Sequence, residues 1–287
     1  MNKSNKKALC SVLALVIILS ALCACSNIKG VFKKEDTTVS TSETTTVTVP
    51  TSTTETTTEN LKTTFREAYT QNVYPALEKD SSGKFSHKIS EYSTYFNTGD
   101  VSRSSNIRHA AASINGLVIP SGGSFSFNQN VGKRTGPAGY DEAHVIRDGE
   151  LVDGMGGGVC QVSTTIFEAV LRANVKILER HNHSLKVGYV PLGGDATVSF
   201  GSQDLKFRNT LGCDIKLSMK CSGGKLTCAV YSAKKVDVGN INISIKPDGA
   251  GGMDFVLTRS VNGKVNYSTK SHYDEQKTTA ASTTKKR

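Results

Sequence analysis

The fold is decided by the stretch Gly156-Gly157-Gly158-Val159-Cys160-Gln161-Val162-Ser163-Thr164-Thr165. In it, three glycines lead directly into a cysteine, and a helical pattern of apolar residues begins immediately afterwards. The pattern follows the spacing i, i+4, i+8 and i+11 of one helix face, at Val162, Ile166, Val170 and Ala173. This spacing predicts a buried helix of about four turns, with Cys160 in its first turn.

A cysteine in the first turn of a helix has a particular chemistry. Free backbone N–H groups and the positive end of the helix dipole stabilise a thiolate and lower the pKa of the thiol. Gly157 and Gly158 have no side chains, so a substrate backbone could approach Cys160 closely. The residues alone leave two interpretations open: a nucleophilic cysteine presented by a glycine loop, or a glycine turn followed by a buried structural cysteine.

The N-terminal residues predict export and lipidation. Residues 1–24 combine a basic start with an apolar core, as a secretory signal does. The sequence Leu22-Cys23-Ala24-Cys25 resembles a bacterial lipobox, which favours a cleaved signal over an uncleaved anchor. We expect Cys25 to carry the lipid that holds the protein at the extracellular face of the cytoplasmic membrane, in the cell envelope.

The charge of the chain fits a partner in the cell wall. The formal net charge is +10, and removal of the three signal lysines leaves +7. A basic protein outside the cell is suited to anionic wall polymers. Nucleic acid is not expected as a partner, because no stripe of alternating basic and aromatic residues occurs.

Composition divides the chain into segments. Residues 37–64 contain 18 serines and threonines in 28 positions, with almost nothing to bury, and should be disordered. Residues 65–100 form a lead-in of ambiguous pattern, in which a short helix is expected at 65–69 and a strand at 89–96. The expected segments are the signal 1–24, a disordered tether 25–64, the lead-in 65–100, a packed domain 101–233, a β-rich extension 234–275 and a loose tail 276–287.

Local patterns predict the first elements of the packed domain. A helix that Ser104 or Ser105 caps should end at Gly116 and bury one face, formed by Ile107, Ala110, Ala111 and Ile114. Residues 125–127 are typical of a strand with both aromatic rings on one face. Residues 145–152 predict a hairpin.

After Asn174 the pattern indicates strands, at 175–178, 186–190, 196–200, 205–207, 236–245 and 255–267, the last with a turn at Asn262-Gly263. Residues 214–232 predict a hairpin that places Cys221 opposite Leu226 and Met219 opposite Cys228. Cys213, Cys221 and Cys228 then lie on the core side as buried thiols, with a disulfide left open. The expected fold class is α+β, with a mostly antiparallel sheet, one or two packed helices and the Cys160 helix central.

Blocks of sequence between residues 106 and 210 match a known pattern. They are Asn115-Gly116, 120–128, 131–135, Gly139-Tyr140, 156–165, 179–184, 189–198 and 204–209. In this order the blocks resemble the VanW domain, which is named from glycopeptide-resistance gene clusters. One position departs from the family, because this chain has Ser121-Gly122-Gly123 where the family usually has Pro-Gly-Glu.

The resemblance implies a chemistry. Some VanW-like proteins resemble the L,D-transpeptidases of the cell wall, which use a cysteine to take an acyl group from a tetrapeptide stem and pass it to an amine of a neighbouring stem. By this resemblance, Cys160 is the nucleophile and peptidoglycan stem peptides are the substrates. The His-Gly-Cys motif usual in L,D-transpeptidases is absent, so the scaffold would be a different one.

A thiolate nucleophile needs a base, and the base needs a group that orients it. His183 matches the His-Ser step of the family and is preferred over His181. Asp195 follows a glycine turn and could fix the imidazole tautomer. The alternatives are a structural histidine and a turn carboxylate. A metal site of His181, His183 and His144 is disfavoured, and no C-x-x-C pair occurs, so neither a metal nor another cofactor is expected.

Acyl transfer also needs an oxyanion hole and a clamp for the substrate. The backbone N–H of Cys160 and the side chain of Gln161 are the expected oxyanion donors. Arg134 and Arg180 could bind stem carboxylates, unless they only form surface salt bridges. The substrate-binding candidates are Arg134, Gly157, Gly158, Gln161, Arg180 and Tyr189.

Three functions remain open at this point. The first is a lipid-anchored cysteine L,D-transpeptidase that forms peptidoglycan cross-links. The second is a non-catalytic peptidoglycan-binding lipoprotein, and the third is a cysteine peptidase or amidase acting on stem peptides. Cys160, His183 and Asp195 together favour an enzyme over a binding protein, but transfer and hydrolysis differ only in acceptor binding and water exclusion.

Overall fold

The structure is a computed structural model that describes residues 77–147, 149–249 and 252–275. The predicted signal, Cys25, the tether, the helix at 65–69 and the tail lie outside the described residues. Among the residues that are described, no helix is both long and apolar enough to cross a membrane.

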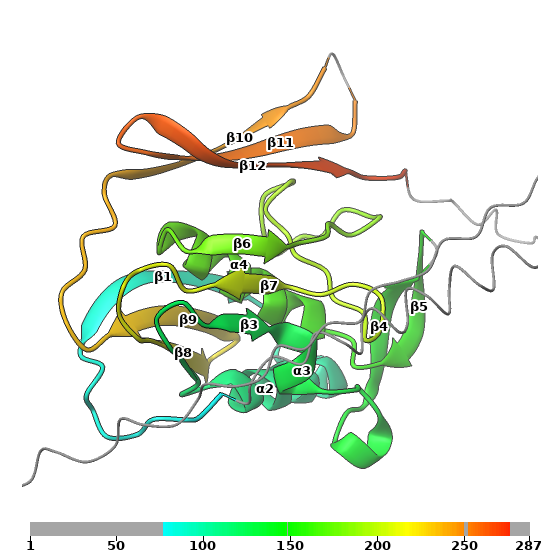
Figure 1. Cartoon of the computed structure of the whole chain (residues 1–287). Helices are drawn as coiled ribbons and strands as arrows, with labels where there is room; N and C mark the ends of the chain where they lie inside the picture. Colours follow the sequence, from blue (N-terminus) through cyan, green and yellow to red (C-terminus); the bar gives the residue numbers. More distant parts are fainter. Residues whose placement is uncertain (1–76, 148, 250–251, 276–287) are drawn as a thin grey trace, which may run out of the picture. The chain divides into compact units, whose positions relative to one another are not determined.

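Antiparallel strands predominate in the described residues, with a few helices among them (Figure 1). In chain order the elements are β1 (His87–Tyr95), α2 (Val101–Ile114), β2 (Val118–Ile119), β3 (Ser124–Ser126), α3 (Phe127–Val131), η1 (Gly136–Ala138), β4 (Glu142–Arg147), β5 (Glu150–Met155), α4 (Val159–Arg172), β6 (Lys176–Glu179), β7 (Lys206–Arg208), β8 (Ile215–Ser222), β9 (Lys225–Ser232), β10 (Ile241–Pro247), β11 (Asp254–Val261) and β12 (Lys264–His272). The prediction of an α+β fold with a mostly antiparallel sheet is confirmed.

The strands form separate sheets. The largest has the order β1-β9-β8-β2, and two three-stranded sheets have the orders β3-β7-β6 and β10-β11-β12. Strands β4 and β5 pair only with each other, as the predicted hairpin. Every named strand pair is antiparallel.

Helix α4 confirms the periodic pattern that follows the glycines. The four residues of the predicted face are fully buried, at Val162, Ile166, Val170 and Ala173. The helix packs against the largest sheet, where Thr94 of β1 and Thr165 of α4 share a hydrogen bond of 2.8 Å between their hydroxyls. This packing holds against the sheet the helix whose first turn carries Cys160.

The hairpin of β8 and β9 has the predicted register. Cys221 lies opposite Leu226, and Met219 lies opposite Cys228. Cys228 is buried, whereas Cys213 and Cys221 are only half-buried. The described cysteines are all free, so the disulfide left open by the sequence does not form among them.

Two predicted element boundaries are wrong. Helix α2 begins at Val101, not after Ser104 or Ser105, because the Asp100 carboxylate accepts the Arg103 N–H as the helix cap. Residues 125–127 are not one strand. Phe127 begins α3, because the Ser126 hydroxyl caps that helix by accepting the Gln129 N–H.

The segments 186–190 and 196–200 are loops rather than the predicted strands. Ala196 shows the reason, since its backbone bonds to side chains of α4 instead of to a neighbouring strand. Its N–H donates to the Thr164 hydroxyl over 2.9 Å, and its carbonyl accepts from Ser163 over 2.5 Å. The loop that carries Asp195 is therefore attached to the helix that carries Cys160.

Strands also pack against the predicted domain, residues 101–233, from before its start and after its end. Strand β1 pairs with β9, so the packing begins before Val101. At the other end, the predicted turn joins β11 to β12, with positive φ at Asn262 and Gly263. The buried Arg259 of β11 donates to the carbonyls of Leu171 and Val175, which ties this sheet to the end of α4.

Candidate active site

The glycine loop before Cys160 packs closely against other parts of the protein, and this packing positions the start of α4. Gly158 caps α4 with φ of 100°, a backbone conformation that favours glycine. A Cβ on Gly158 would lie 2.9 Å from Ile107, and one on Gly157 would lie 2.6 Å from the carbonyl oxygen of His144. Glycine is therefore required at both positions by close packing within the protein.

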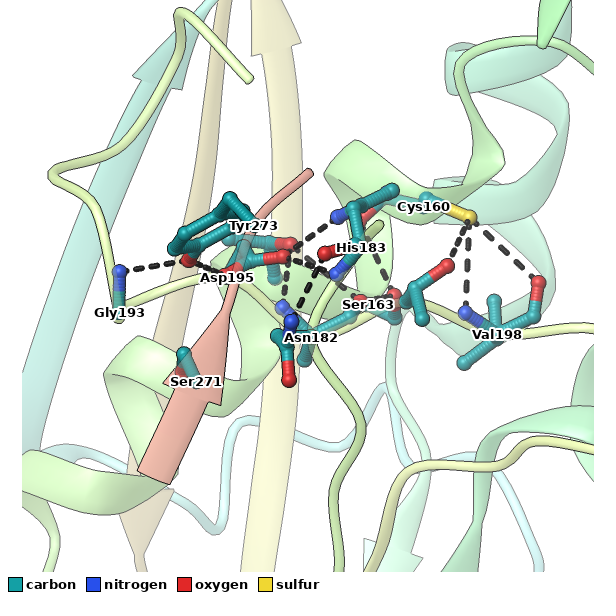
Figure 2. Close-up of polar contacts among 12 residues, drawn as sticks. Cys160, Ser163, Asn182, His183, Gly193, Asp195, Val198, Ser271 and Tyr273 are labelled. Carbon is teal, nitrogen blue, oxygen red and sulfur yellow. Dashed lines mark hydrogen bonds and ion pairs between the residues drawn. The ribbon is translucent and has the colours of Figure 1, made fainter. Parts of the chain in front are cut away.

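The Cys160 sulfur lies against the loop that follows Asp195. Its contacts are the Thr197 hydroxyl at 3.4 Å, the Val198 carbonyl at 3.4 Å and the Val198 N–H, which points to the sulfur at 3.5 Å (Figure 2). The thiol is half-buried. A thiolate at Cys160 could accept hydrogen bonds from the Thr197 hydroxyl and the Val198 N–H.

His183 and Asp195 form the pair that sequence reasoning proposed. His183 Nδ1 and Asp195 Oδ2 are 2.6 Å apart, and the same oxygen accepts the His183 backbone N–H at 2.7 Å (Figure 2). Asp195 is fully buried and His183 nearly so. His181 instead pairs with Glu179 at 3.0 Å, so the structure places His183, not His181, beside Asp195.

Cys160 and His183 shift each other's protonation. Burial raises the pKa of the Cys160 thiol, but the nearby cationic His183, with Thr197 and Val198, outweighs burial and lowers the pKa from 9.0 to about 7. Burial lowers the pKa of His183, but the hydrogen bond with Asp195 and the nearby Cys160 thiolate raise it from 6.5 to about 9. Because Nδ1 is bonded to Asp195, Nε2 is the nitrogen left for the sulfur.

Asp195 is held as a carboxylate by several donors. Burial raises its pKa, but the hydrogen bond and charge of His183, the charge of Arg180 and the hydrogen bond of Tyr273 together lower it. The Arg180 guanidinium donates to both the Asp195 backbone carbonyl at 2.6 Å and its Oδ1 at 3.2 Å. This side chain is 1% exposed and lies outside the cavity lining, so the structure does not bring Arg180 to a substrate.

A cavity of about 980 Å³ opens beside Cys160 and His183. The proposed substrate-binding residues Arg134, Gly157, Gly158, Gln161 and Tyr189 all line it. Among the described residues, its basic lining residues are Arg103, Lys133, Arg134, Arg147 and Lys186, and its acidic ones are Asp100 and Asp274. The lining therefore favours an anionic ligand.

The part of the chain that contains these residues is similar to known proteins. The family described as "VanW like protein" matches residues 102–231. We name these residues the VanW-like domain after this similarity. The chain is 42% identical over 167 residues, 58% of its length, to the Bacillus subtilis (strain 168) protein named "Uncharacterized protein YoaR". It is 32% identical over 135 residues, 45% of its length, to the "Vancomycin B-type resistance protein VanW" of Enterococcus faecalis (strain ATCC 700802 / V583).

The chain spans about half the length of these curated relatives, 55% of the first and 49% of the second. No solved structure matches the chain. The matched range contains Cys160, His183 and Asp195, but ends before β10. The VanW-like domain thus supplies these three residues, and the sheet of β10–β12 lies beyond it.

Gln161 of the VanW-like domain has a role other than the predicted one. Its side-chain amide donates to the Thr94 hydroxyl at 3.0 Å and to the Tyr95 carbonyl at 2.9 Å, and its oxygen accepts from Arg103 at 2.7 Å. Both amide hydrogens are used in these bonds. The Gln161 side chain therefore anchors α4 to β1 and does not donate to an oxyanion.

Other residues of the cavity have partners within the VanW-like domain. Arg134 donates to Asn128 Oδ1 at 2.7 Å, while its guanidinium lies 6.0 Å from the ring centroid of Phe127. The Tyr189 ring meets the His183 ring edge to face, with centroids 6.5 Å apart. No group of three or more His, Cys, Asp or Glu side chains among the described residues could hold a metal ion.

Sequence reasoning missed two residues of the site. Thr197 contacts the Cys160 sulfur, and its only signal was its place in the matched block after Asp195. Tyr273 donates to Asp195 Oδ1 at 2.5 Å, from beyond the VanW-like domain. No local pattern points to Tyr273, because the contact joins residues 78 positions apart.

The paired pKa shifts predict a reactive thiol at neutral pH. Alkylation of Cys160 by iodoacetamide should rise through pH 7, about two pH units below an ordinary thiol, because the thiolate forms while His183 is still cationic. Labelling followed by peptide mass spectrometry measures the midpoint for Cys160 alone. In His183→Gln the midpoint should move upward, since burial alone raises a thiol pKa. A midpoint at or above pH 9 in the unmodified protein would contradict the ion pair.

Proposed function

We propose that the protein is a cysteine acyltransferase of the L,D-transpeptidase type that cross-links peptidoglycan stem peptides. The observation that carries the proposal is the Cys160 thiol at a basic cavity, with its pKa lowered by His183, which Asp195 orients. A thiolate, a proton carrier and an orienting carboxylate are the groups that acyl transfer through a thioester requires.

The first half-reaction forms the thioester. The Cys160 thiolate attacks the carbonyl carbon that precedes the terminal D-alanine, and a C–S bond forms as the carbonyl electrons move to oxygen. When the tetrahedral oxyanion collapses, the C–N bond breaks and His183 gives its Nε2 proton to the departing D-alanine amine. The N–H of Cys160, in the first turn of α4, is the proposed oxyanion donor, supported by the helix dipole.

The second half-reaction transfers the acyl group. An acceptor amine from a neighbouring stem attacks the thioester carbon and loses a proton to His183. The C–S bond then breaks and restores the thiolate and the imidazolium. Asp195 keeps the imidazole in one orientation through both halves, because its Oδ2 binds Nδ1 and the His183 N–H together.

The cavity lining supports a stem peptide as the substrate. Stem peptides carry carboxylates, and the basic side chains of Lys133, Arg147 and Lys186 are exposed at the cavity. Charge-assisted hydrogen bonds from such groups would orient the donor stem. The resemblance to a protein named for vancomycin resistance is consistent with a substrate in the cell envelope.

The proposed location follows from the N-terminal sequence. A lipid on Cys25 would hold the protein at the extracellular face of the membrane, and residues 25–64 would act as a tether between the lipid and the domain. The domain would then reach stem peptides without a transmembrane helix.

Incubation of the purified protein with a disaccharide-tetrapeptide tests the proposal. We expect mass spectrometry to detect a cross-linked dimer whose mass shows the loss of one D-alanine. Release of D-alanine without a dimer would instead make the protein a hydrolase of stem peptides. Binding without any turnover would assign it to the non-catalytic, peptidoglycan-binding class.

A further inference from the structure

Tyr273 closes the side of Asp195 that faces away from His183. Its hydroxyl donates to Asp195 Oδ1 at 2.5 Å and accepts the Gly193 N–H at 2.6 Å (Figure 2). The side chain is 1% exposed. One buried hydroxyl therefore satisfies both the carboxylate and the turn that precedes it.

The chain on either side of Tyr273 is bonded to the loop that carries His183. The Asp274 N–H donates to the Ser184 carbonyl at 2.6 Å, and the Asn182 side chain donates to the His272 carbonyl at 2.6 Å. Arg180, just before this loop, donates to Ser271 at 2.8 Å. Residues 271–274 thus contact both neighbours of His183.

We infer that Tyr273 is a positioning residue for the acyl-transfer site, and that the end of β12 is thereby a working part of that site. The inference rests on the proposed function and adds to it, since Tyr273 lies outside the matched VanW-like range. Tyr273 does not contact the sulfur and is not itself one of the cavity-lining residues. It acts through Asp195.

The effect of Tyr273 on Asp195 follows from the polar groups that removal of its hydroxyl would leave unpaired. Without the hydroxyl, Asp195 Oδ1 loses a donor and the buried Gly193 N–H loses its acceptor. Both losses are relieved if the carboxylate turns toward Gly193, which draws Oδ2 away from His183 Nδ1. The other charged or titratable groups that act on His183 and Asp195 are Cys160, Glu168, Arg180 and Tyr189.

Tyr273→Phe in the full chain tests the inference, with Tyr267→Phe on β12, the strand that Tyr273 directly follows, as the matched control. We expect Tyr273→Phe to lower kcat about tenfold with KM changed less than about twofold, because the substrate does not touch Tyr273. Tyr267 does not contact Asp195, so its variant should keep wild-type kinetics. Equal kcat in Tyr273→Phe and the wild-type protein, or a change confined to KM, would overturn the inference.

Iodoacetamide labelling of Cys160 gives a readout that needs no acyl transfer. In Tyr273→Phe, the labelling rate at pH 7 should fall about threefold, because the less firmly held His183 supports the thiolate less well. If labelling responds but no variant forms a dimer, the positioning role stands and the proposed reaction fails. If labelling is unchanged, the positioning role fails whatever the reaction is.

A second variant covers the case in which Tyr273→Phe does not fold. Asp274→Pro removes the N–H that bonds to Ser184 and loosens the attachment of Tyr273 without changing its side chain. Asp274→Ala is its control, because it removes the same carboxylate and keeps the N–H. Both variants lose the Asp274 carboxylate that lines the cavity, so the comparison is between them. A slower Cys160 labelling rate in the proline variant than in the alanine variant would support the inference, and equal rates in the two would oppose it.

Discussion

Cys160→Ala is expected to eliminate dimer formation from a disaccharide-tetrapeptide, with a fall in rate of at least about 10,000-fold. The reason is that no other described cysteine can replace it. Cys228 is buried, with a pKa that burial raises, and Cys213 and Cys221 lie outside the cavity lining. Mass spectrometry of the products over a long incubation measures the residual rate.

The matched control for this prediction is Cys213→Ala, which removes a half-buried thiol that lies away from the cavity. It should form dimers at the wild-type rate. Cys160→Ala should also retain stem-peptide binding, because the basic lining residues are unchanged. Dimer formation that survives in Cys160→Ala would rule out the proposed nucleophile.

Helix α4 could be predicted from the sequence because its signal is local. Apolar residues at helical spacing after Cys160 can bury one face only if the segment is a helix. The hairpin of β8 and β9 was predictable for the same reason, since the Gly223-Gly224 turn and the alternation of side chains together fix the register. In both cases neighbouring residues carry the whole argument.

The loops around the site could not be predicted this way. Residues 196–200 alternate like a strand, yet Ala196 bonds to Ser163 and Thr164 of α4. An alternating pattern identifies a segment that could pair as a β-strand, but it does not identify the partner that the segment contacts in the folded protein. Arg180 and Gln161 illustrate the same limit, because a matched block predicts a substrate contact for Arg180 and a place beside Cys160 predicts an oxyanion contact for Gln161. The structure uses their donors inside the protein.

Asp195 explains why these polar residues are buried together. Its two oxygens accept from His183, Arg180 and Tyr273, which come from separate parts of the chain. A buried carboxylate is costly unless such donors surround it. The arrangement that keeps Asp195 charged also fixes the orientation of His183, so the stability and the chemistry of the site depend on the same contacts.

Asp195→Asn should therefore reduce both activity and stability. An amide can turn its NH₂ toward His183 Nδ1 and force the wrong tautomer, which should lower kcat by about 1,000-fold to 10,000-fold. The buried Arg180 would lose its counter-charge, at a cost of about 3 kcal/mol in the free energy of unfolding. Steady-state kinetics and urea denaturation measure the two effects. Asp153→Asn is the control, because Asp153 is exposed and lies outside the cavity lining. Wild-type kcat in Asp195→Asn would show that Asp195 serves the fold alone.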